Sequence, residues 1–342
     1  MKAIGFLASH EGTTAEALTD IEIDRPTPSG RDLLVQIQAI SVNPVDTKVR
    51  RRTTGTGGTY QILGWDAVGE VISVGERATT YRPGDKVWYA GDITRPGANA
   101  EYHLVDERIV GKRPGTLSDA EAAAIPLTAI TAWELLFDRL GFDEVADGEK
   151  KPGPRLLIVG AAGGVGSILV QLAKQLTDAT VIGTASRPQS QAWVTELGAD
   201  HVLDHRRPFV EELSRVGIDN VTHVISLNHT DDHFDRLIEA LAPQGKFALI
   251  DDPQTLLDIR KLKQKSISLH WELMFTRSMF ETDDMTKQRD LLNRVAELID
   301  EGRIRTTVGA NYGSISAENL RKAHRDIESG SAIGKIVLEG FD

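Results

Sequence analysis

The chain contains no cysteine in its 342 residues. This absence excludes disulfide bonds and every zinc site that needs a thiolate ligand. Basic residues are outnumbered as well, because 39 Lys and Arg stand against 50 Asp and Glu, which gives a formal net charge of -11. We therefore expect no surface for nucleic acid or for an anionic membrane, and we expect the partners to be small molecules.

Long apolar runs are also missing. The most apolar stretch, "AAAIPLTAI" (122–130), is interrupted by Pro126, and the opening "MKAIGFLASH" lacks the apolar core of a signal peptide. These features predict a cytoplasmic protein with no membrane segment. Hydrophobic residues make up 40% of the chain and charged residues 26%, a composition typical of a globular protein long enough for two domains with separate cores.

The pattern of predicted elements changes near residue 126. Before it, short strand candidates alternate with turns, including Pro-Gly pairs at 83–84 and 96–97, which is typical of an antiparallel, barrel-like fold. After a predicted helix that ends at Gly141 and a polar connection at 142–154, strands and helices alternate from "LLIVG" (156–160) to "GKFALID" (245–251). That alternation predicts an α/β domain with a doubly wound parallel sheet, which "SISLHWEL" (266–273) would extend.

A glycine-rich turn, "GAAGGVGSIL" (160–169), joins the first strand of this sheet to a helix. Ala161, Gly163 and Gly166 follow the A-x-G-x-x-G spacing of dinucleotide sites, in which the middle glycine lets a pyrophosphate approach the backbone. Gly164 and Val165 open the helix, whose N-terminal N–H groups and dipole favour phosphate binding. The alternative is a tight turn with no ligand.

The second strand of the predicted sheet indicates which nucleotide would bind. An NAD site normally has an acidic residue at the end of this strand, but the chain has "GTASRPQ" (183–189) there. Ser186 can donate a hydrogen bond to a 2′-phosphate, and Arg187 can form a charge-assisted fork with it. These residues favour NADPH over NADH, unless Arg187 is only a surface residue at a helix start.

Motifs spread along the whole chain resemble those of the medium-chain dehydrogenase/reductase superfamily, in its quinone-oxidoreductase-like branch, which is often labelled zinc-type alcohol dehydrogenase-like. The segments that carry the resemblance are "ISVNPVDTKVR" (40–50), "LGWDAVGEV" (63–71), "PGDKVWYAG" (83–91), "IPLTAITAWE" (125–134), "GAAGGVGS" (160–167), "TASR" (184–187), "LGADHVLDH" (197–205), "MFTRSMF" (274–280) and "GKIVLEG" (334–340).

The resemblance implies a GroES-like β-barrel domain, a Rossmann domain inserted in it, an active-site cleft at their junction and a homodimer. It places the catalytic domain at 1–126 and 274–342 and the NADPH-binding Rossmann domain at 127–273. By position in the family motifs, it also implies four further cofactor contacts. These are Thr131 near the nicotinamide phosphate, His205 near the adenosine phosphate, Asn228 at the end of the fourth strand, and Lys335 after a loop near the cofactor. Each of the four could equally be a strand-end or surface residue.

The chain departs from the zinc-dependent relatives at their metal ligands. Asn43 stands where those relatives have a cysteine, and Trp65–Asp66 stand where they have a His–Glu pair. Zinc needs three or four convergent His, Cys or carboxylate ligands. His229 and His233 share the H-x-x-x-H spacing of zinc proteases, but position 230 is Thr where the general-base Glu should be. We therefore expect no metal.

A metal-free reductase needs a substrate that accepts hydride readily, such as a quinone or an α,β-unsaturated carbonyl, with hydrogen-bond donors for the developing oxyanion. The resemblance places Asn43 and Asp46 in the motif that lines the nicotinamide pocket, and Lys48 at a position facing the substrate. Lys48 could supply charge or a proton, or be a solvated lysine, and Asp46 could equally serve a turn or an ion pair. The alternatives are a zinc-type alcohol dehydrogenase and a non-catalytic NADPH-binding redox sensor or structural protein.

Overall fold

The computed structural model describes residues 1–8, 13–53, 58–145 and 153–341, so part of the predicted connection, 146–152, lies outside the described residues. The chain forms two compact units. Unit 1 comprises 1–130 and 275–342, and unit 2 comprises 131–274. The sequence had placed these boundaries at 126/127 and 273/274.

Unit 2 is built on a six-stranded sheet in the order β11-β10-β9-β12-β13-β14, in which every neighbouring pair is parallel. This is the strand order of a dinucleotide-binding Rossmann fold. The strands are β9 (Arg155–Val159), β10 (Thr180–Thr184), β11 (His201–Leu203), β12 (Val221–Ser226), β13 (Leu241–Leu249) and β14 (Ser268–Trp271).

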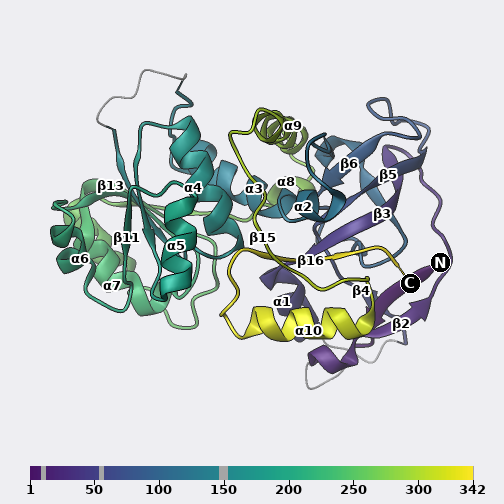
Figure 1. The fold of residues 1–342 in the computed structure, drawn as a ribbon, viewed down its shortest axis with the longest axis horizontal. Helices are drawn as coiled ribbons and strands as arrows, with labels where there is room; N and C mark the ends of the chain where they lie inside the picture. Colours follow the sequence, from purple (N-terminus) through teal and green to yellow (C-terminus); the bar gives the residue numbers. More distant parts are fainter. Residues whose placement is uncertain (9–12, 54–57, 146–152, 342) are drawn as a thin grey trace. The chain divides into compact units, whose positions relative to one another are not determined.

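Helices cover both faces of this sheet. They are α4 (Gly164–Leu176), α5 (Pro188–Glu196), α6 (Phe209–Arg215) and α7 (Thr230–Ala240), and Figure 1 shows α4 and α5 on one face with α6 and α7 on the other. Because both faces are covered, the central strand β9 is apolar on both sides and buried from Leu156 to Val159. The core beneath α6 and α7 includes Phe209, Phe234 and Phe247.

Unit 1 contains two sheets. The larger has the order β15-β16-β3-β5-β6-β8, with β7 also pairing with β3, and the smaller has the order β2-β1-β4. The strands of the larger sheet are β3 (Asp32–Val42), β5 (Ala67–Val74), β6 (Lys86–Tyr89), β7 (Tyr102–Asp106), β8 (Gly111–Lys112), β15 (Val308–Asn311) and β16 (Lys335–Glu339). Those of the smaller are β1 (Lys2–Phe6), β2 (Thr19–Glu22) and β4 (Gln61–Ile62).

The predicted barrel takes the form of these two sheets. Among the described strands the hydrogen-bonded order of the larger sheet is open, with β15 and β8 at its ends. Around the sheets lie the helices α1 (Pro44–Arg52), α2 (Asp119–Ala123), α8 (Thr276–Met279), α9 (Lys287–Asp300) and α10 (Ala317–Glu328). The strands are mostly antiparallel, as the turn-rich sequence predicts, and among the strands that the structure describes in unit 1 only β15 and β16 form a parallel pair.

The helix predicted to end at Gly141 is confirmed. It begins with Pro126 as the first residue of α3 (Pro126–Trp133), where proline needs no N–H partner, and together with α2 it makes 119–139 a nearly continuous helical stretch. A π-helical turn, η3 (Glu134–Arg139), follows α3 directly. The whole segment is long and apolar enough to cross a membrane, but 83% of its most apolar window is buried inside the protein, as in a core helix.

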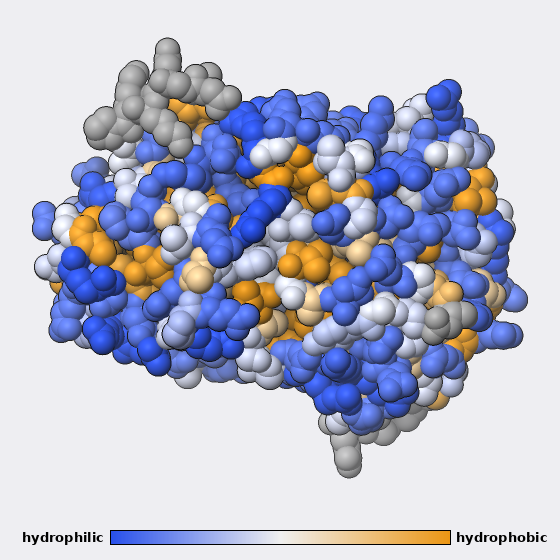
Figure 2. Space-filling view, in the orientation of Figure 1, coloured by the Kyte–Doolittle hydropathy of each residue, from blue (hydrophilic) through white to orange (hydrophobic). Residues whose placement is uncertain are grey.

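The surface is mainly polar. Figure 2 shows one face of the protein, on which hydrophilic residues predominate and hydrophobic residues occur in limited groups. Most large apolar side chains of the described residues are instead buried in the cores of the two units.

Candidate functional site

The glycine-rich turn of unit 2 follows β9 and leads directly into α4, with Gly163 at its N-cap and Gly164 as its first residue. Gly160 has a φ of 82°, and a side chain there would also meet Asn228, whose Oδ1 would lie 2.7 Å from an added Cβ. Asn228 thus packs against the turn, as its place after β12 suggests. The Gly160 N–H donates to Thr184 Oγ1 at 3.1 Å, which ties the turn to the end of β10.

Gly163 and Gly166 meet different surroundings in this turn. An added Cβ on Gly166 would lie 2.4 Å from the Gly160 carbonyl oxygen and 2.6 Å from Ala161 Cα, so this glycine lets α4 pack against the turn. An added Cβ on Gly163 would meet only the Gly160 oxygen, at 3.5 Å. No side chain caps the N-terminus of α4 among the described residues. Its first N–H groups, including those of Gly164 and Val165, suit an anion.

The end of β10 carries the residues that the sequence assigns to the nucleotide. Ala185 is buried and its N–H donates to the Leu203 carbonyl at 2.9 Å, which joins this end to the end of β11. Ser186 is half-buried and Arg187 is exposed at the N-cap of α5. Ser190 Oγ accepts a hydrogen bond from the Arg187 N–H at 3.2 Å, which fixes the backbone from which the arginine projects.

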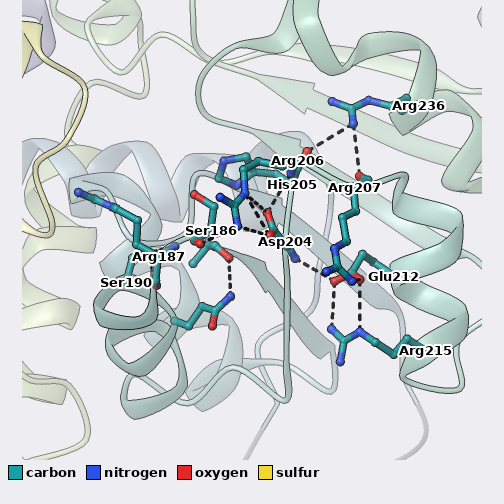
Figure 3. Close-up of polar contacts among 12 residues, drawn as sticks. Ser186, Arg187, Ser190, Asp204, His205, Arg206, Arg207, Glu212, Arg215 and Arg236 are labelled. Carbon is teal, nitrogen blue, oxygen red and sulfur yellow. Dashed lines mark hydrogen bonds and ion pairs between the residues drawn. The ribbon is translucent and has the colours of Figure 1, made fainter.

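A group of charged residues that sequence reasoning missed follows β11. Arg206 pairs with Asp204, and its Nη2 also donates to the Ser186 carbonyl at 3.1 Å (Figure 3). Arg207 and Arg215 both pair with Glu212. The loop after β11 therefore brings additional guanidinium groups to the end of β10. The only signal in the sequence was the short "HRR" stretch at 205–207, which no motif marked.

His205 is half-buried in the same loop, and burial lowers the pKa of its imidazole. Its Nδ1 is buried without a hydrogen-bond partner in the described part of the chain. The ring lies 5.9 Å from that of His233, which accepts a hydrogen bond from Arg236 at Nδ1 and whose pKa burial lowers to about 4. Both histidines are therefore neutral near pH 7, and the loop's positive charge comes from its arginines.

Unit 1 contains a second polar cluster, formed by Asn43, Asp66 and Lys335. Asn43 follows β3, Asp66 precedes β5, and Lys335 begins β16. The sheet register brings these positions together, because Ile336 pairs with Val42 and the Ser41 N–H donates to the Asp66 carbonyl at 3.1 Å.

All three side chains of this cluster are buried and hydrogen-bonded. Lys335 Nζ donates to Asp66 Oδ2 at 2.9 Å and also to Asn43 Oδ1, while Asn43 Nδ2 donates to Asp66 Oδ2 at 3.1 Å. The Lys335 side chain is 3% exposed and that of Asp66 is 0% exposed. Burial raises the pKa of the Asp66 carboxyl, and the Lys335 charge opposes that rise. The cluster is a buried cation held in place by a carboxylate and an amide.

Asp46 lies beside this cluster in the first turn of α1. Its Oδ2 accepts a hydrogen bond from the Asn43 N–H at 2.6 Å, which forms the capping box that starts the helix. Burial raises the pKa of Asp46 to about 7, although the Asn43 N–H and the Lys335 charge both act to lower it. The structure therefore gives Asp46 a turn-forming role and a carboxyl that exchanges its proton near neutral pH.

Known protein families match segments in both units. The alcohol dehydrogenase GroES-like domain family matches residues 29–120, and the zinc-binding dehydrogenase family matches residues 197–338. A zinc-type alcohol dehydrogenase-like protein of Staphylococcus epidermidis is 37% identical over 338 residues, which cover 99% of both chains. This chain belongs to the medium-chain dehydrogenase/reductase superfamily, in its quinone-oxidoreductase-like branch. It is an oxidoreductase of that family.

Solved structures of this superfamily resemble the chain over its length. A putative zinc-dependent alcohol dehydrogenase protein from Rhizobium etli is 52% identical, with a TM-score of 0.93, and the match covers 100% of this chain and 98% of that one. The Escherichia coli quinone oxidoreductase, solved in complex with NADPH, is 26% identical with a TM-score of 0.82 over 99% of this chain and all of the other.

Relatives of this chain carry the name zinc-type, but the residues at the corresponding positions here have other partners. Position 43 is an asparagine whose Oδ1 accepts from Lys335, and the Trp65 indole N–H donates to the Asp92 carbonyl at 3.0 Å. The Lys335 ammonium already pairs with Asp66, and the neighbouring carboxyl of Asp46 accepts a hydrogen bond from the Asn43 N–H. No group of three His, Cys, Asp or Glu residues that could hold a metal occurs among the described residues. These donors do not fit zinc.

The H-x-x-x-H pair of this family member does not form a metal site either. His229 is largely exposed and has left-handed backbone geometry at the N-cap of α7, where its Nδ1 lies 3.4 Å from Asp232. His233 is held by Arg236. The two imidazoles have different partners and show no common ligand geometry.

Two other predicted residues lie outside these clusters. Lys48 is half-buried on α1, whose buried residues are Asp46, Thr47 and Arg50. Arg50 rather than Lys48 is the buried cation of this helix, and it donates to His324 Nδ1 at 2.6 Å. Thr131 is buried on α3. The catalytic role of Lys48 and the cofactor contact of Thr131 stay predictions.

Proposed function

We propose that this oxidoreductase is an NADPH-dependent, metal-free reductase of quinones or α,β-unsaturated carbonyls. The observation that carries the proposal is the Lys335 ammonium held between Asn43, which stands where zinc-dependent relatives have a cysteine, and Asp66 of the pair that stands where they have His–Glu. The Lys335 ammonium paired with Asp66 takes the place of the positive charge that a metal would bring. A reductase without a Lewis acid needs a conjugated acceptor, in which charge spreads away from the carbon that receives hydride.

The nucleotide part of the proposal rests on unit 2. The N-terminus of α4 and the open space beside Gly163 suit a pyrophosphate, and the end of β10 offers Ser186 and Arg187 to a 2′-phosphate. A charge-assisted arginine contact is worth about 1.5 to 3 kcal/mol, or about 10- to 150-fold in affinity. Arg187→Ala should therefore weaken NADPH binding about 10-fold or more and leave NADH binding nearly unchanged. An equal loss of affinity for NADPH and NADH would show that Arg187 does not contact the 2′-phosphate.

When bound, NADPH supplies the hydride and leaves as NADP⁺. The chain's own residues then have two tasks. Ser186, Arg187 and the glycine turn hold the nucleotide, while positive charge stabilises the oxygen of the acceptor as it becomes an enolate or phenolate. Lys48 is the proposed donor to that oxygen, and water replaces the proton that it gives up. Asp46 and the Lys335 cluster keep the first turns of α1 in place.

The test is NADPH oxidation by the purified protein with a panel of quinones and enones, together with a measurement of bound zinc. We expect turnover that survives extended chelation and far less than one zinc per chain. Alcohol oxidation with NADP⁺ serves as the comparison reaction. Stoichiometric zinc whose removal abolishes turnover would overturn the metal-free assignment.

A zinc-dependent alcohol dehydrogenase is the second candidate, because the 52% identical Rhizobium etli protein carries that description. The same zinc measurement separates it from the first. A protein that binds NADPH but turns over no member of the panel would instead point to a non-catalytic redox sensor or structural role.

A further inference from the structure

The loop after β11 presents an arginine whose orientation is fixed from two strand ends. Arg206 Nε donates to Asp204 Oδ1 at 2.9 Å and Nη2 donates to Asp204 Oδ2 at 2.5 Å. The same Nη2 donates to the Ser186 carbonyl at 3.1 Å (Figure 3). Because Asp204 follows β11 and Ser186 follows β10, these bonds hold the guanidinium beside the residue expected to meet the 2′-phosphate.

This anchoring leaves one edge of the guanidinium open. Arginine has five N–H donors, and the bonds to Asp204 and Ser186 use those on Nε and Nη2. In the described ranges, no residue hydrogen-bonds to Arg206 Nη1. The side chain of Arg206 is 67% exposed, so this edge is accessible to an anion from solution. Little orientational freedom remains to be lost on binding, which favours a planar guanidinium at such a site.

Asp204 would otherwise be a reason to expect NAD at this position, since a carboxylate near the ribose repels a 2′-phosphate. Both of its oxygens are occupied by Arg206, and its side chain is 15% exposed. The Arg206 contacts lower the pKa of Asp204 to about 2, so the carboxylate remains charged and paired throughout the neutral range. The pair removes the negative charge that would discriminate against NADPH.

The neighbouring arginines differ from Arg206 in their partners. Arg207 and Arg215 share the carboxylate of Glu212, and Arg215 Nη2 also donates to the Val202 carbonyl at 3.3 Å. Arg236 Nη1 donates to the carbonyls of His205 and Arg207, so this arginine fixes the backbone of the loop after β11. In the view of Figure 3, the side chains of Arg187 and Arg206 lie on different sides of Ser186.

We propose that Arg206 is a second specificity-determining residue for NADPH, binding the 2′-phosphate through Nη1 across Ser186 from Arg187. Asp204 is its positioning residue. This inference rests on the proposed NADPH dependence and adds a residue from a different strand end. A phosphate between two guanidinium groups is bound more tightly than by either alone, and each charge-assisted contact contributes about 10-fold or more in affinity.

The experiment measures dissociation constants for NADPH and NADH in the wild type, Arg206→Gln and Arg215→Gln. Arg215 is the matched control, because it is also an ion-paired arginine of this region with a 53% exposed side chain. We expect Arg206→Gln to weaken NADPH binding about 10-fold or more and to change NADH binding less than about twofold. Arg215→Gln should change neither by more than about twofold. Unchanged NADH binding also shows that the variant is folded.

Competition by 2′,5′-ADP and 5′-AMP isolates the 2′-phosphate from the rest of the nucleotide. If the wild type prefers 2′,5′-ADP and Arg206→Gln retains that preference within about threefold, the inference is overturned while the proposed NADPH dependence stands. If the wild type has no preference for NADPH or 2′,5′-ADP, the proposed cofactor fails and the inference fails with it. Loss of preference in Arg206→Gln but not in Arg215→Gln supports both.

Discussion

Removing the Lys335 ammonium should show how much this buried cation stabilises the charged form of Asp66 and, with it, the fold of unit 1. In Lys335→Met the side chain keeps much of its apolar length but no longer donates to Asp66 and Asn43. Breaking a buried pair by deleting one partner costs about 3 to 5 kcal/mol, since the remaining charge is left without compensation. Asp66 retains hydrogen bonds from Asn43 Nδ2 at 3.1 Å and the Leu127 N–H at 3.2 Å. These bonds place the expected loss near the lower end of that range.

The loss should depend on pH in a defined direction. Burial already raises the pKa of Asp66 in the wild type, and removal of the Lys335 charge raises it further. The unfolded pKa of such a carboxyl is about 3.9, and its folded pKa is higher. Its contribution to the stability of the fold is complete below the unfolded pKa and is lost as the pH rises through the folded pKa. Lys335→Met should therefore be close to wild-type stability near pH 4 and lose up to about 1.4 kcal/mol per pH unit above it.

The assay is urea unfolding at several pH values, with Trp65 and Trp88 as buried reporters in unit 1. Lys261→Met is the control, because Lys261 pairs with Asp235 in solvent, and it should cost less than about 1 kcal/mol. Lys335→Met/Asp66→Asn should recover most of the stability and lose the added pH dependence. A loss of the same size at pH 5 and pH 8, or below about 1 kcal/mol at pH 8, would refute the reasoning.

Four further variants test other parts of the two units. Asp46→Asn should remove a decline in stability between about pH 4 and 7, because burial raises the folded pKa of Asp46 to about 7; pH-dependent thermal melts measure this, and an unchanged profile would contradict it. Gly163→Ala should preserve the melting temperature but weaken nucleotide binding about 10-fold. Gly166→Ala should lower the melting temperature by several degrees, because its added Cβ would lie 2.4 Å from backbone. A larger drop in melting temperature for Gly163→Ala than for Gly166→Ala would contradict the packing of the turn. Lys48→Met should slow hydride transfer by roughly 10²-fold with little change in cofactor affinity. Single-turnover rates within about threefold of wild type would show that Lys48 is a solvated surface residue with no part in the reaction.

Local sequence patterns were sufficient for the order of elements in unit 2. The apolar "LLIV" lies in β9, the glycine turn begins α4, and the strands from "TVIGT" to "SLHW" follow in the parallel sheet. The polar strand β2 (Thr19–Glu22) was missed, because its residues are largely exposed and have no apolar alternation to mark it. Pro126 interrupts an apolar run in the sequence, and it also begins the helix predicted to end at Gly141, because proline fits the first helical position.

The two charged clusters differ in what the sequence could reveal. Lys335 and Asp66 are separated by 269 positions, and only the pairing of β16 with β3 brings them together. Such a contact follows from sheet register, which no local pattern encodes. Asp204 and Arg206 are two residues apart, but their relation to Ser186 depends on the parallel pairing of β10 with β11. The residue types were visible in each case, and their spatial relation was not.

The division of unit 1 into two segments imposes an order on its synthesis. Asp66 leaves the ribosome 269 residues before Lys335, a delay of roughly 15 to 50 seconds at common translation rates. During that time unit 2 can form from continuous chain, whereas the Ala39–Val42 end of β3 lacks its partner β16 and offers an unpaired strand edge to other nascent chains. Arrival of β16 supplies both the missing hydrogen bonds and the counterion of Asp66. A chain released before this strand would carry an open strand edge, which can pair with another chain, and the Asp66 carboxylate without its counterion.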